Sequence, residues 1–197
     1  MRNHTELLNY LAVKYGLNYY LEIGVQNKAN NYNKIICPVK VGVDPNVNDS
    51  EIRGMSSDDY FEAIKNNKPP TSFDLIFIDG YHEAEQVKRD FENSLKCLRP
   101  GGFIVIHDTL PENEAGTRVP RETKVWWGDV YKFAMKLGQY DGIDFVTFDM
   151  DNGCTVAWNK PDNTRQAYAG GYTFDDYMKY RHDLLRIKPA ADIEKYL

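Results

Sequence analysis

Two short apolar runs in the middle of the chain each end at ionisable side chains. Residues 75–78 (LIFI) and 103–106 (FIVI) contain no polar position, which is typical of strands buried on both faces of a parallel sheet. Asp79 and His82 follow the first run, and His107-Asp108 follows the second directly. Because parallel strands end at the same edge of a sheet, we expect these groups to converge and form an active site.

The hydrophobic pattern predicts an α/β fold, doubly wound and Rossmann-like. Its sheet is mostly parallel, has helices on both faces and ends in an antiparallel C-terminal hairpin. Expected strands are residues 19–25, 39–44, 75–78, 103–106, 143–149 and 154–159, and the central order is β-α-β-α-β-α-β. Expected helices are a leading helix ending at Gly16, then 58–64, a helix starting near Ala84, 129–137 closed by Gly138, and 173–187 stopped by Pro189. Asn152-Gly153 is a strong tight-turn signal for the hairpin.

The length of 197 residues predicts one domain, with a leading helix in 1–17, the core in 18–159, and a linker and helix in 160–197. The C-terminal helix is expected either to pack on its own domain or to cover the active site or a partner subunit, the last in a homo-oligomer. Both roles stay open at this point.

Charge and cysteine content narrow the choice of partners. The net charge of -5 offers no basic stripe for a phosphate backbone, so a small molecule or a glycan is favoured over nucleic acid. The chain shows no signal-peptide core and no apolar run long enough to span a bilayer, so no membrane partner is expected. Three widely spaced cysteines, Cys37, Cys97 and Cys154, are typical of reduced, partly buried thiols in a cytoplasmic protein.

A glycine and an acid at two strand ends indicate a nucleoside ligand. Gly24 closes the first strand and permits close approach of a ligand or of backbone, although a plain strand-to-loop turn explains it as well. Asp44 ends the second strand, where an acid can bind the two hydroxyls of a ribose. The GxGxxG fingerprint of a pyrophosphate cradle is absent, which favours a nucleoside cofactor without a diphosphate, such as S-adenosylmethionine.

In the order LEIGV, VGVDP, FDLIFIDGYH, LRPGG and IVIHD, the chain resembles class I S-adenosylmethionine-dependent methyltransferases over about residues 19–159. The resemblance implies that Glu22, Gly24 and Val25 line the methionine end of the cofactor and that Asp44 holds its ribose. It places the segment 54–57, with Met55 and Ser56, near the adenine, and it puts Asp79 at the cofactor too. The loop after Gly24, QNKAN, lacks the further glycines that the family usually carries.

The acid and imidazole groups give a second, sharper resemblance, to the metal-dependent sugar O-methyltransferases of macrolide biosynthesis. Asp79-Gly80-Tyr81-His82 followed by Asp108 is similar to their pattern, which implies a divalent cation, Mg²⁺ first, held by Asp79 and Asp108, with His82 as the base. His107 stands where an acid is expected. A hard cation prefers oxygen, so His107 as a ligand would admit a softer metal, or none.

A cation is also expected on physical grounds. Two carboxylates about 4 Å apart repel by about 4 kcal/mol at an effective dielectric near 20, so such a pair favours a cation or a shared proton. An alcohol acceptor is nearly un-ionised at neutral pH, and a bound cation would lower its pKa while His82 accepts the proton. The alternatives are that the two acids cap neighbouring helices and that His107 is a buried histidine bonded to backbone.

Downstream, Arg121 and the run Trp126-Trp127-Gly128-Asp129 resemble a bacterial and phage subgroup of the same superfamily that is often linked to surface-glycan genes. This implies that Arg121, Trp127 and Asp129 bind a sugar. The alternative is that the tryptophans are core residues and that Asp129 caps the following helix. His4 and His182 are expected at the surface.

The leading hypothesis is an S-adenosylmethionine-dependent O-methyltransferase that methylates a hydroxyl of a saccharide or a glycosylated small molecule with metal help. A second hypothesis keeps fold and metal but changes the reaction, as in the related cephalosporin hydroxylases. A third is a catalytically silent cofactor-binding subunit that serves a partner through the C-terminal helix, against which the intact acid and histidine cluster argues.

Overall fold

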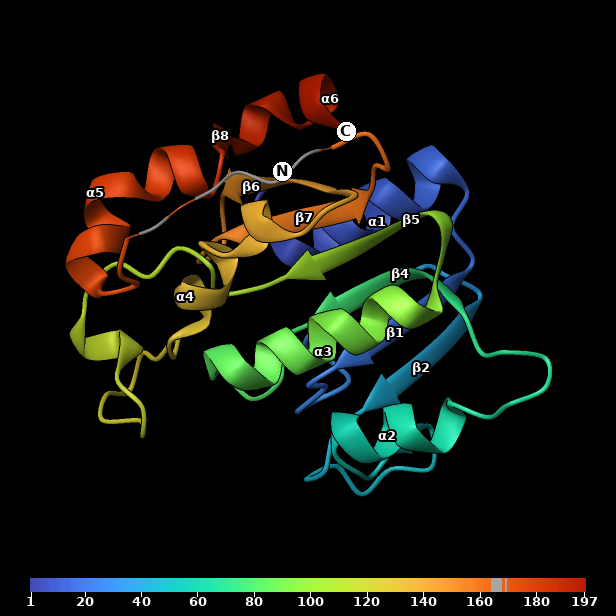
Figure 1. Cartoon of the computed structure of the whole chain (residues 1–197). Helices are drawn as coiled ribbons and strands as arrows, with labels where there is room; N and C mark the ends of the chain where they lie inside the picture. Colours follow the sequence, from blue (N-terminus) through green and yellow to red (C-terminus); the bar gives the residue numbers. More distant parts are fainter. Residues whose placement is uncertain (164–167, 169) are drawn as a thin grey trace.

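The computed structural model describes residues 1–163, 168 and 170–197 and is built around one eight-stranded sheet (Figure 1). The strand order is β3-β2-β1-β4-β5-β7-β6-β8. In chain order the strands are β1 (Tyr19–Ile23), β2 (Val39–Val43), β3 (Ile52–Arg53), β4 (Phe73–Ile78), β5 (Leu98–Ile106), β6 (Ile143–Asp149), β7 (Cys154–Asn159) and β8 (Ile187–Pro189). The first five are parallel, so β1, β2, β4 and β5 deliver their carboxyl ends to one edge.

Helices cover both faces of this sheet, as the hydrophobic pattern predicts (Figure 1). The helices are α1 (His4–Tyr15), α2 (Ser57–Ile64), α3 (Ala84–Cys97), α4 (Val130–Ala134), α5 (Phe174–Leu184) and α6 (Ile193–Tyr196). Leu75 and Phe77 pack in a core shared with α1, whereas Ile76 and Ile78 pack on the opposite side with α2, α3 and α4. Alternate residues of β4 thus enter two separate cores, which explains why residues 75–78 have no polar position.

The start of α1 is well determined by its sequence. The Asn3 side chain caps the helix by accepting a hydrogen bond from the Glu6 N–H at 3.0 Å, and Gly16 ends it in the left-handed conformation (φ 65°). Leu7, Leu8 and Leu11 are fully buried. This helix places its first residue, His4, beside the carboxyl end of the sheet.

The predicted hairpin is present, with β6 and β7 antiparallel and joined by a tight turn. β7 also pairs antiparallel with β5, and β8 adds a parallel edge strand beside β6. Asp151 and Asn152 in the turn have positive φ, and the N–H groups of Thr109 and Leu110 donate to the carbonyls of Gly153 and Asn152. The turn is therefore fastened to the segment that follows β5.

Three sequence-based expectations about elements were wrong, and one short strand was not predicted. Between β1 and β2 the described chain forms only a 3-10 turn, Tyr32–Lys34, because residues 26–31 are a polar run with no helical repeat of apolar positions. The two-residue strand β3 was not predicted. The helix expected at 129–137 ends at Ala134, and Gly138 lies inside a 3-10 turn, Leu137–Gln139. The last long helix ends at Leu184, and residues 187–189 form β8.

The C-terminal helix α5 packs on its own domain. Tyr177 and Leu185 are buried with Tyr131, Ala134 and Met135 of the α4 region. Thr173 and Asp176 form a capping box at its start. The linker expected before α5 includes residues 164–167 and 169, which lie outside the described ranges. Association of α5 with a partner stays a prediction.

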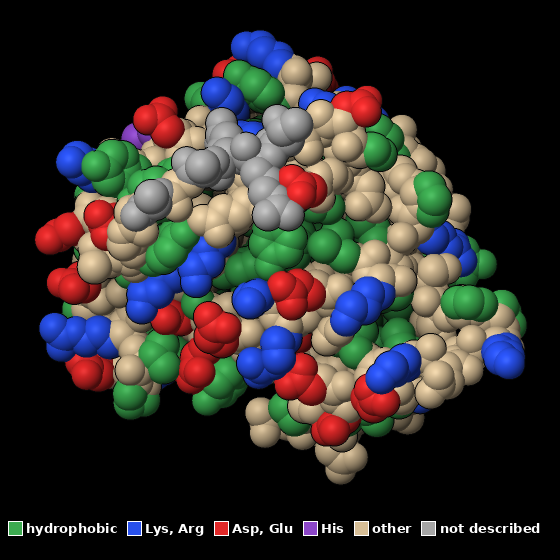
Figure 2. Space-filling view, in the orientation of Figure 1, with side chains coloured by type: hydrophobic (Ala, Val, Ile, Leu, Met, Phe, Trp, Pro, Cys, Tyr) green, Lys and Arg blue, Asp and Glu red, His purple; other side chains and the backbone are tan. Residues whose placement is uncertain are grey.

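Acidic and basic side chains are interspersed on the face shown in Figure 2. Cys37, Cys97 and Cys154 are buried free thiols. Within the described ranges, no helix combines the length and the apolar character that crossing a membrane requires.

Candidate active site

A cavity of about 620 Å³ opens at the carboxyl ends of β1, β2, β4 and β5. On one side it is lined by Glu22, Gly24, Val25 and Asp44, and on the other by the acid and imidazole groups of residues 79–82 and 107–108. Its size suits a small-molecule site. The structure therefore brings together the two sets of residues that the sequence indicated separately.

Gly24 is required by the backbone around it. Its φ is 90°, and a Cβ at this position would collide with the Asp79 carbonyl and with Gly80. The Gly24 N–H donates to the Val43 carbonyl, and the Asp79 N–H donates to the Ile23 carbonyl. The close approach predicted for Gly24 is thus made by the chain leaving β4, which holds the cofactor side and the acid side in contact.

Glu22 is a buried acid held by two donors. The Tyr20 hydroxyl donates to its carboxylate at 2.6 Å and the Asn31 side-chain amide at 2.8 Å. Burial raises the pKa of Glu22 to about 7, even though both hydrogen bonds favour the charged form. Glu22 is thus part neutral and part charged near neutral pH.

Asp44 occupies the end of β2, as predicted, and is 7% exposed. Its two carboxylate oxygens accept hydrogen bonds from the N–H groups of Gln26 and Asn46, each at 2.8 Å. Each oxygen keeps a second lone pair, so the carboxylate fixes the loop after β1 and can still accept from a hydroxyl in the cavity.

Val25 and Ser56 line the cavity, whereas Met55 does not. The Met55 side chain packs against the core beneath α2. The Ser56 hydroxyl caps α2 by accepting from the Asp59 N–H at 3.1 Å. Adenine contact by Met55 is therefore not supported by its position in the described structure.

At the other side of the cavity, Asp79 and Asp108 are each flanked by imidazoles. His107 Nδ1 lies 3.0 Å from Asp79 Oδ1 and 3.5 Å from Asp108 Oδ1. His82 Nδ1 lies 3.2 Å from Asp108 Oδ2, and His82 Nε2 lies 3.6 Å from Asp79 Oδ1. The positive φ of Asp108, 57°, turns its carboxylate back toward both rings.

These neighbours move the pKa values of the acids in opposite directions. Burial opposes ionisation of Asp79, but the charge of His107 and its hydrogen bond outweigh burial and lower the Asp79 pKa below its usual value. Burial dominates at Asp108 and raises its pKa to about 6. Burial disfavours the charged form of His107 too, yet Asp79 and Asp151 together raise the His107 pKa well above its usual value.

His82 is held flat against an indole ring. The planes of His82 and Trp126 lie 8° apart, with centroids separated by 5.2 Å. The His82 carbonyl accepts from the Asp129 N–H at 3.1 Å, and a Cβ on Gly128 (φ 61°) would collide with that carbonyl. The segment from Trp126 to Asp129 thus positions His82 through both ring and backbone.

The three residues predicted to bind a sugar have different surroundings. Trp127 lines the cavity and is 3% exposed, with its indole N–H unpartnered in the described structure. Asp129 lies outside the lining and accepts from the Ala84 N–H at 2.6 Å, so it caps α3 and not the helix that follows it. Arg121 is exposed, and its guanidinium donates to the carbonyls of Thr123 and Lys124. Sugar contacts by Asp129 and Arg121 are not supported by these positions.

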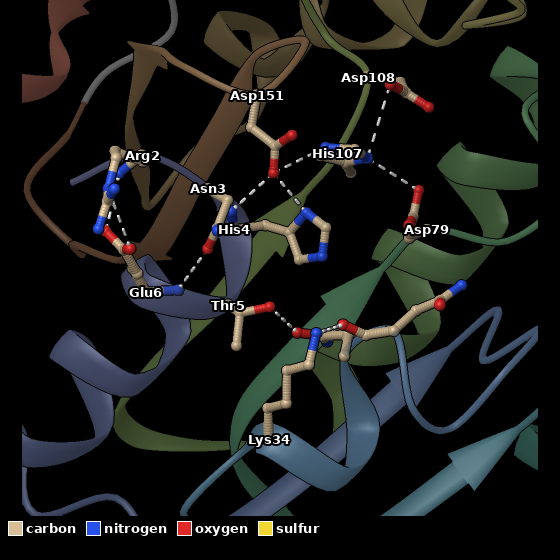
Figure 3. A network of polar contacts seen from close by, with 12 residues as sticks. Arg2, Asn3, His4, Thr5, Glu6, Lys34, Asp79, His107, Asp108 and Asp151 are labelled. Carbon is tan, nitrogen blue, oxygen red and sulfur yellow. Dashed lines mark hydrogen bonds and ion pairs between the residues drawn. The ribbon is translucent and has the colours of Figure 1, made fainter.

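His4, expected at the surface, lies in the site instead, and this expectation was wrong. It lines the cavity, and its ring stacks on Phe77 at 5.1 Å and meets the His107 ring edge-on at 4.7 Å. Figure 3 shows Asp151 from the β6–β7 turn between His4 and His107. The cap at Asn3 signals that a helix starts here, but no pattern in the sequence places that start beside β5. His182 is exposed, as expected.

Asp79, His82 and Asp108 form a group that can hold a divalent cation, since one ligand atom of each lies within 4.8 Å of the others. His82 Nδ1 and Asp108 Oδ1 are buried and have no hydrogen-bond partner in the described part of the chain. Two carboxylates and one imidazole fit such an ion, and the nitrogen makes the set softer than an all-oxygen Mg²⁺ site. His107, predicted as a ligand here, turns Nδ1 to Asp79 as a hydrogen-bonding partner.

Comparisons with known proteins concern the domain and the fold. Residues 24–109, the segment from Gly24 through His107-Asp108, match the family model described as "Methyltransferase domain". Among solved structures, the chain is similar to an O-methyltransferase from Bacillus cereus bound to S-adenosylhomocysteine, with 18% identity, 79% of this chain and 80% of that chain covered, and a TM-score of 0.59.

Two further structures are similar at 16% identity, each covering 79% of this chain and 79% of the other with a TM-score of 0.58. They are the O-methyltransferase TomG from Streptomyces achromogenes, involved in tomaymycin synthesis and bound to S-adenosylmethionine, and a putative O-methyltransferase from Klebsiella pneumoniae. These likenesses show a Rossmann-like methyltransferase fold, which confirms the predicted fold class.

Proposed function

We propose that this protein, whose domain and fold indicate an S-adenosylmethionine-dependent methyltransferase, methylates a hydroxyl of a saccharide or a glycosylated small molecule. The placement of His82 carries the proposal. Its imidazole lies in a cavity between Asp108 and Trp126 and on the side opposite Gly24 and Asp44. A base in that position can accept a hydroxyl proton from an acceptor that faces a methyl donor.

The cofactor would be held at the β1 and β2 ends. Asp44 offers acceptor lone pairs for ribose hydroxyls, and Gly24 and Val25 leave the cavity open where their strand ends. Glu22, with its raised pKa, adds little fixed charge near the methionine end. S-adenosylmethionine supplies the methyl group when bound. Ser56 also lines the cavity and is proposed to lie near the adenine.

An aromatic wall favours a sugar as the acceptor. Trp126 and Trp127 line the cavity beside His82, together with Val125 and Tyr81. Tyr81 is 64% exposed and Val125 is 61% exposed, although each borders the cavity. Flat apolar rings next to hydrogen-bonding groups suit the faces and hydroxyls of a saccharide. A cytoplasmic location is proposed with this activity.

Asp79 and Asp108 are proposed to hold a divalent cation, with Mg²⁺ tested first. Such an ion, when bound, lowers the pKa of an acceptor hydroxyl and helps to hold it in place. In the chain itself, Asp108 lies 3.2 Å from His82 and Asp79 lies 3.0 Å from His107, and the two buried atoms His82 Nδ1 and Asp108 Oδ1 remain available to a cation. Asp79, His82 and Asp108 together fit a divalent cation, and the experiment below determines which ion they bind.

The test measures S-adenosylhomocysteine release with a panel of saccharides and glycosides, with and without EDTA. Asp108→Asn is expected to reduce turnover at least about 100-fold and to leave cofactor affinity within about 3-fold of the parent, because it removes a charge that orients His82. Asp149→Asn, at an exposed acid that ends β6, is the matched control and should change neither quantity.

Loss of turnover with EDTA, and its return with Mg²⁺ or Mn²⁺, would support the cation. Full turnover in EDTA would remove the cation from the proposal and leave His82 as base. Turnover by Asp108→Asn equal to that of the parent would refute the whole assignment. A product heavier by one oxygen in place of one methylene would establish the hydroxylase alternative, and cofactor binding without release for any acceptor would favour a silent subunit.

A further inference from the structure

Three side chains from distant parts of the chain meet at the edge of the cavity (Figure 3). His4 is the first residue of α1, His107 directly follows β5, and Asp151 lies in the β6–β7 turn. One ligand atom of each lies within 4.8 Å of the other two. The set shares no residue with the group of Asp79, His82 and Asp108, although His107 contacts both acids, and it does not depend on the proposed methyl transfer.

One ring nitrogen of each histidine in this group is left without a hydrogen bond of good geometry, and both of these nitrogens face Asp151. His4 Nδ1 and His107 Nε2 are buried, and neither makes a hydrogen bond in the described structure. Both point toward the same atom, Asp151 Oδ2, at 2.6 Å and 3.7 Å respectively. That oxygen also accepts from the His4 backbone N–H at 2.8 Å, so it cannot satisfy both rings well. His107 is 8% exposed, which makes an orphaned nitrogen there costly.

The spacing suits a metal ion. Around a tetrahedral Zn²⁺ with bonds of about 2.0 Å, ligand atoms lie about 3.3 Å apart. The two measured separations, 2.6 Å and 3.7 Å, bracket that distance. Small movements of His4 and Asp151 would equalise them, since their side chains are 20% and 26% exposed.

Neighbouring groups hold the two rings in orientations suitable for binding. Asp79 Oδ1 lies 3.0 Å from His107 Nδ1, so the carboxylate can accept that N–H and direct the other nitrogen to Asp151. A carboxylate behind an imidazole is the usual arrangement at metal sites. The stack on Phe77 orients His4. A metal ion would replace a proton on His107 Nε2, so binding competes with protonation.

Open space adjoins the group on two sides. His4 and His107 line the large cavity, whereas Asp151 lines a second cavity of about 280 Å³ beyond the β6–β7 turn. Asn152 borders both. An ion thus has a route of entry, and three protein ligands would leave a coordination position for water or a ligand.

We propose that His4, His107 and Asp151 form a transition-metal site of the Zn²⁺ class, with Asp79 as the residue that orients His107. Two imidazoles and one carboxylate prefer such an ion to Mg²⁺. The bound ion fastens the start of α1 to the β6–β7 turn and to His107, which directly follows β5. It therefore stabilises the folded chain by mass action.

The test uses protein without a histidine tag, titrated with Zn²⁺ by calorimetry and checked by metal analysis after dialysis. His4→Phe keeps an aromatic ring against Phe77 but removes the ligand, and Asp151→Asn keeps a residue that tolerates the positive φ of 47°. Two matched controls are His82→Phe, in the neighbouring acid group, and His182→Phe, at an exposed position.

The parent is expected to hold one tight equivalent of Zn²⁺ and to melt at a higher temperature with Zn²⁺ than with Mg²⁺. His4→Phe and Asp151→Asn should weaken that equivalent at least about 10-fold and lose the thermal shift, whereas both controls retain them. Unchanged binding in His4→Phe and Asp151→Asn would overturn the proposal. So would loss of the tight equivalent in His82→Phe alone, or no binding by the parent at micromolar Zn²⁺.

Discussion

The two sides of the cavity are built in different ways. At the β1 and β2 ends, the acids are held by hydrogen bonds from neutral groups: Glu22 by Tyr20 and Asn31, and Asp44 by two backbone N–H groups. At the β4 and β5 ends, Asp79 and Asp108 face imidazoles from other segments.

The two sides therefore contribute different properties to the cavity: the first mainly its shape, the second mainly its charged groups. The first side is set by backbone geometry and by a buried carboxyl with a raised pKa, so it presents a shaped and weakly charged surface. The second side concentrates acids and bases whose protonation depends on one another. Changes on the first side should mainly alter folding and cofactor affinity, and changes on the second side should mainly alter turnover.

The largest effect is expected at Gly24, where the two sides touch. Gly24→Ala forces a side chain into the Asp79 carbonyl at a φ of 90°, and should lower the free energy of unfolding by at least about 3 kcal/mol. Gly101→Ala is the matched control, because Gly101 has a φ of 77° with open space around its Cβ position. It should cost about 1 kcal/mol. Equal losses in urea denaturation would show that contact between the two sides is unimportant.

A smaller effect is expected from Glu22, through pH. The folded chain keeps a proton on Glu22 up to a pKa of about 7, whereas the unfolded chain releases it near 4.5. Stability from this group is therefore complete at low pH and is lost as pH rises through that window, by about 3 kcal/mol. Glu22→Gln should flatten the pH dependence of urea unfolding between pH 4.5 and 7, although Asp90, whose pKa burial raises to about 6, retains part of the slope.

Glu92→Gln provides the control for this comparison, since Glu92 also accepts from a tyrosine hydroxyl, that of Tyr140 at 3.0 Å, but at a less buried position. It should leave the slope unchanged. A Glu22→Gln protein whose slope equals that of the parent would contradict a neutral Glu22 on the cofactor side.

The affinity for S-adenosylmethionine tests the role of Asp44 on the first side. Asp44→Ala removes acceptors for the Gln26 and Asn46 N–H groups and for a ribose, and should weaken S-adenosylmethionine binding about 10- to 100-fold by calorimetry. Asp49→Ala is a matched control, since Asp49 also accepts a backbone N–H, that of Glu51, but outside the cavity lining. If both variants bind the cofactor equally well, Asp44 has no ligand role.

The smallest effect is expected at Trp126, which should act on turnover alone. Trp126→Ala removes the ring stacked on His82 and should lower kcat about 3- to 10-fold while S-adenosylmethionine affinity stays unchanged. Trp126→Phe, which can still stack, should recover most of the activity. A loss of cofactor affinity in Trp126→Ala would break the separation of the two sides.

The sequence predicted the parts of this site that depend on local pattern. Asp79, His82 and Asp108 come directly after buried strands, so the strand pattern alone places them at one edge. Gly24 and Asp44 are found in the same way. The strand β3 was missed because its two residues are ordered by pairing with β2, Gly42 opposite Ile52, and carry no pattern of their own.

The part of the site that the sequence did not predict depends on contacts between distant segments. His4 meets Asp151 across 147 positions of the chain, and both approach His107 only because α1 packs under the sheet next to the hairpin turn. The role of Asp129 also depends on a contact between distant segments. Its position suggested a cap for its own helix, but its carboxylate reaches Ala84 at the start of α3.

The segment from Trp126 to Asp129 is held to His82 by ring stacking and by a backbone hydrogen bond, and this has a consequence for how the neighbouring loop can change in evolution. The loop between Leu110 and Val125 begins at the bond from the Leu110 N–H to the Asn152 carbonyl and ends just before the bonds that join Trp127 to Gly116 and Asp129 to His82. Because both ends are fixed, lengthening the exposed stretch 118–122 of this loop costs mainly closure entropy, about 0.6 kcal/mol for each doubling. Insertions there would reshape the aromatic wall of the cavity while the bond between Asp129 and His82 keeps His82 in place, so we expect this stretch to tolerate changes in length.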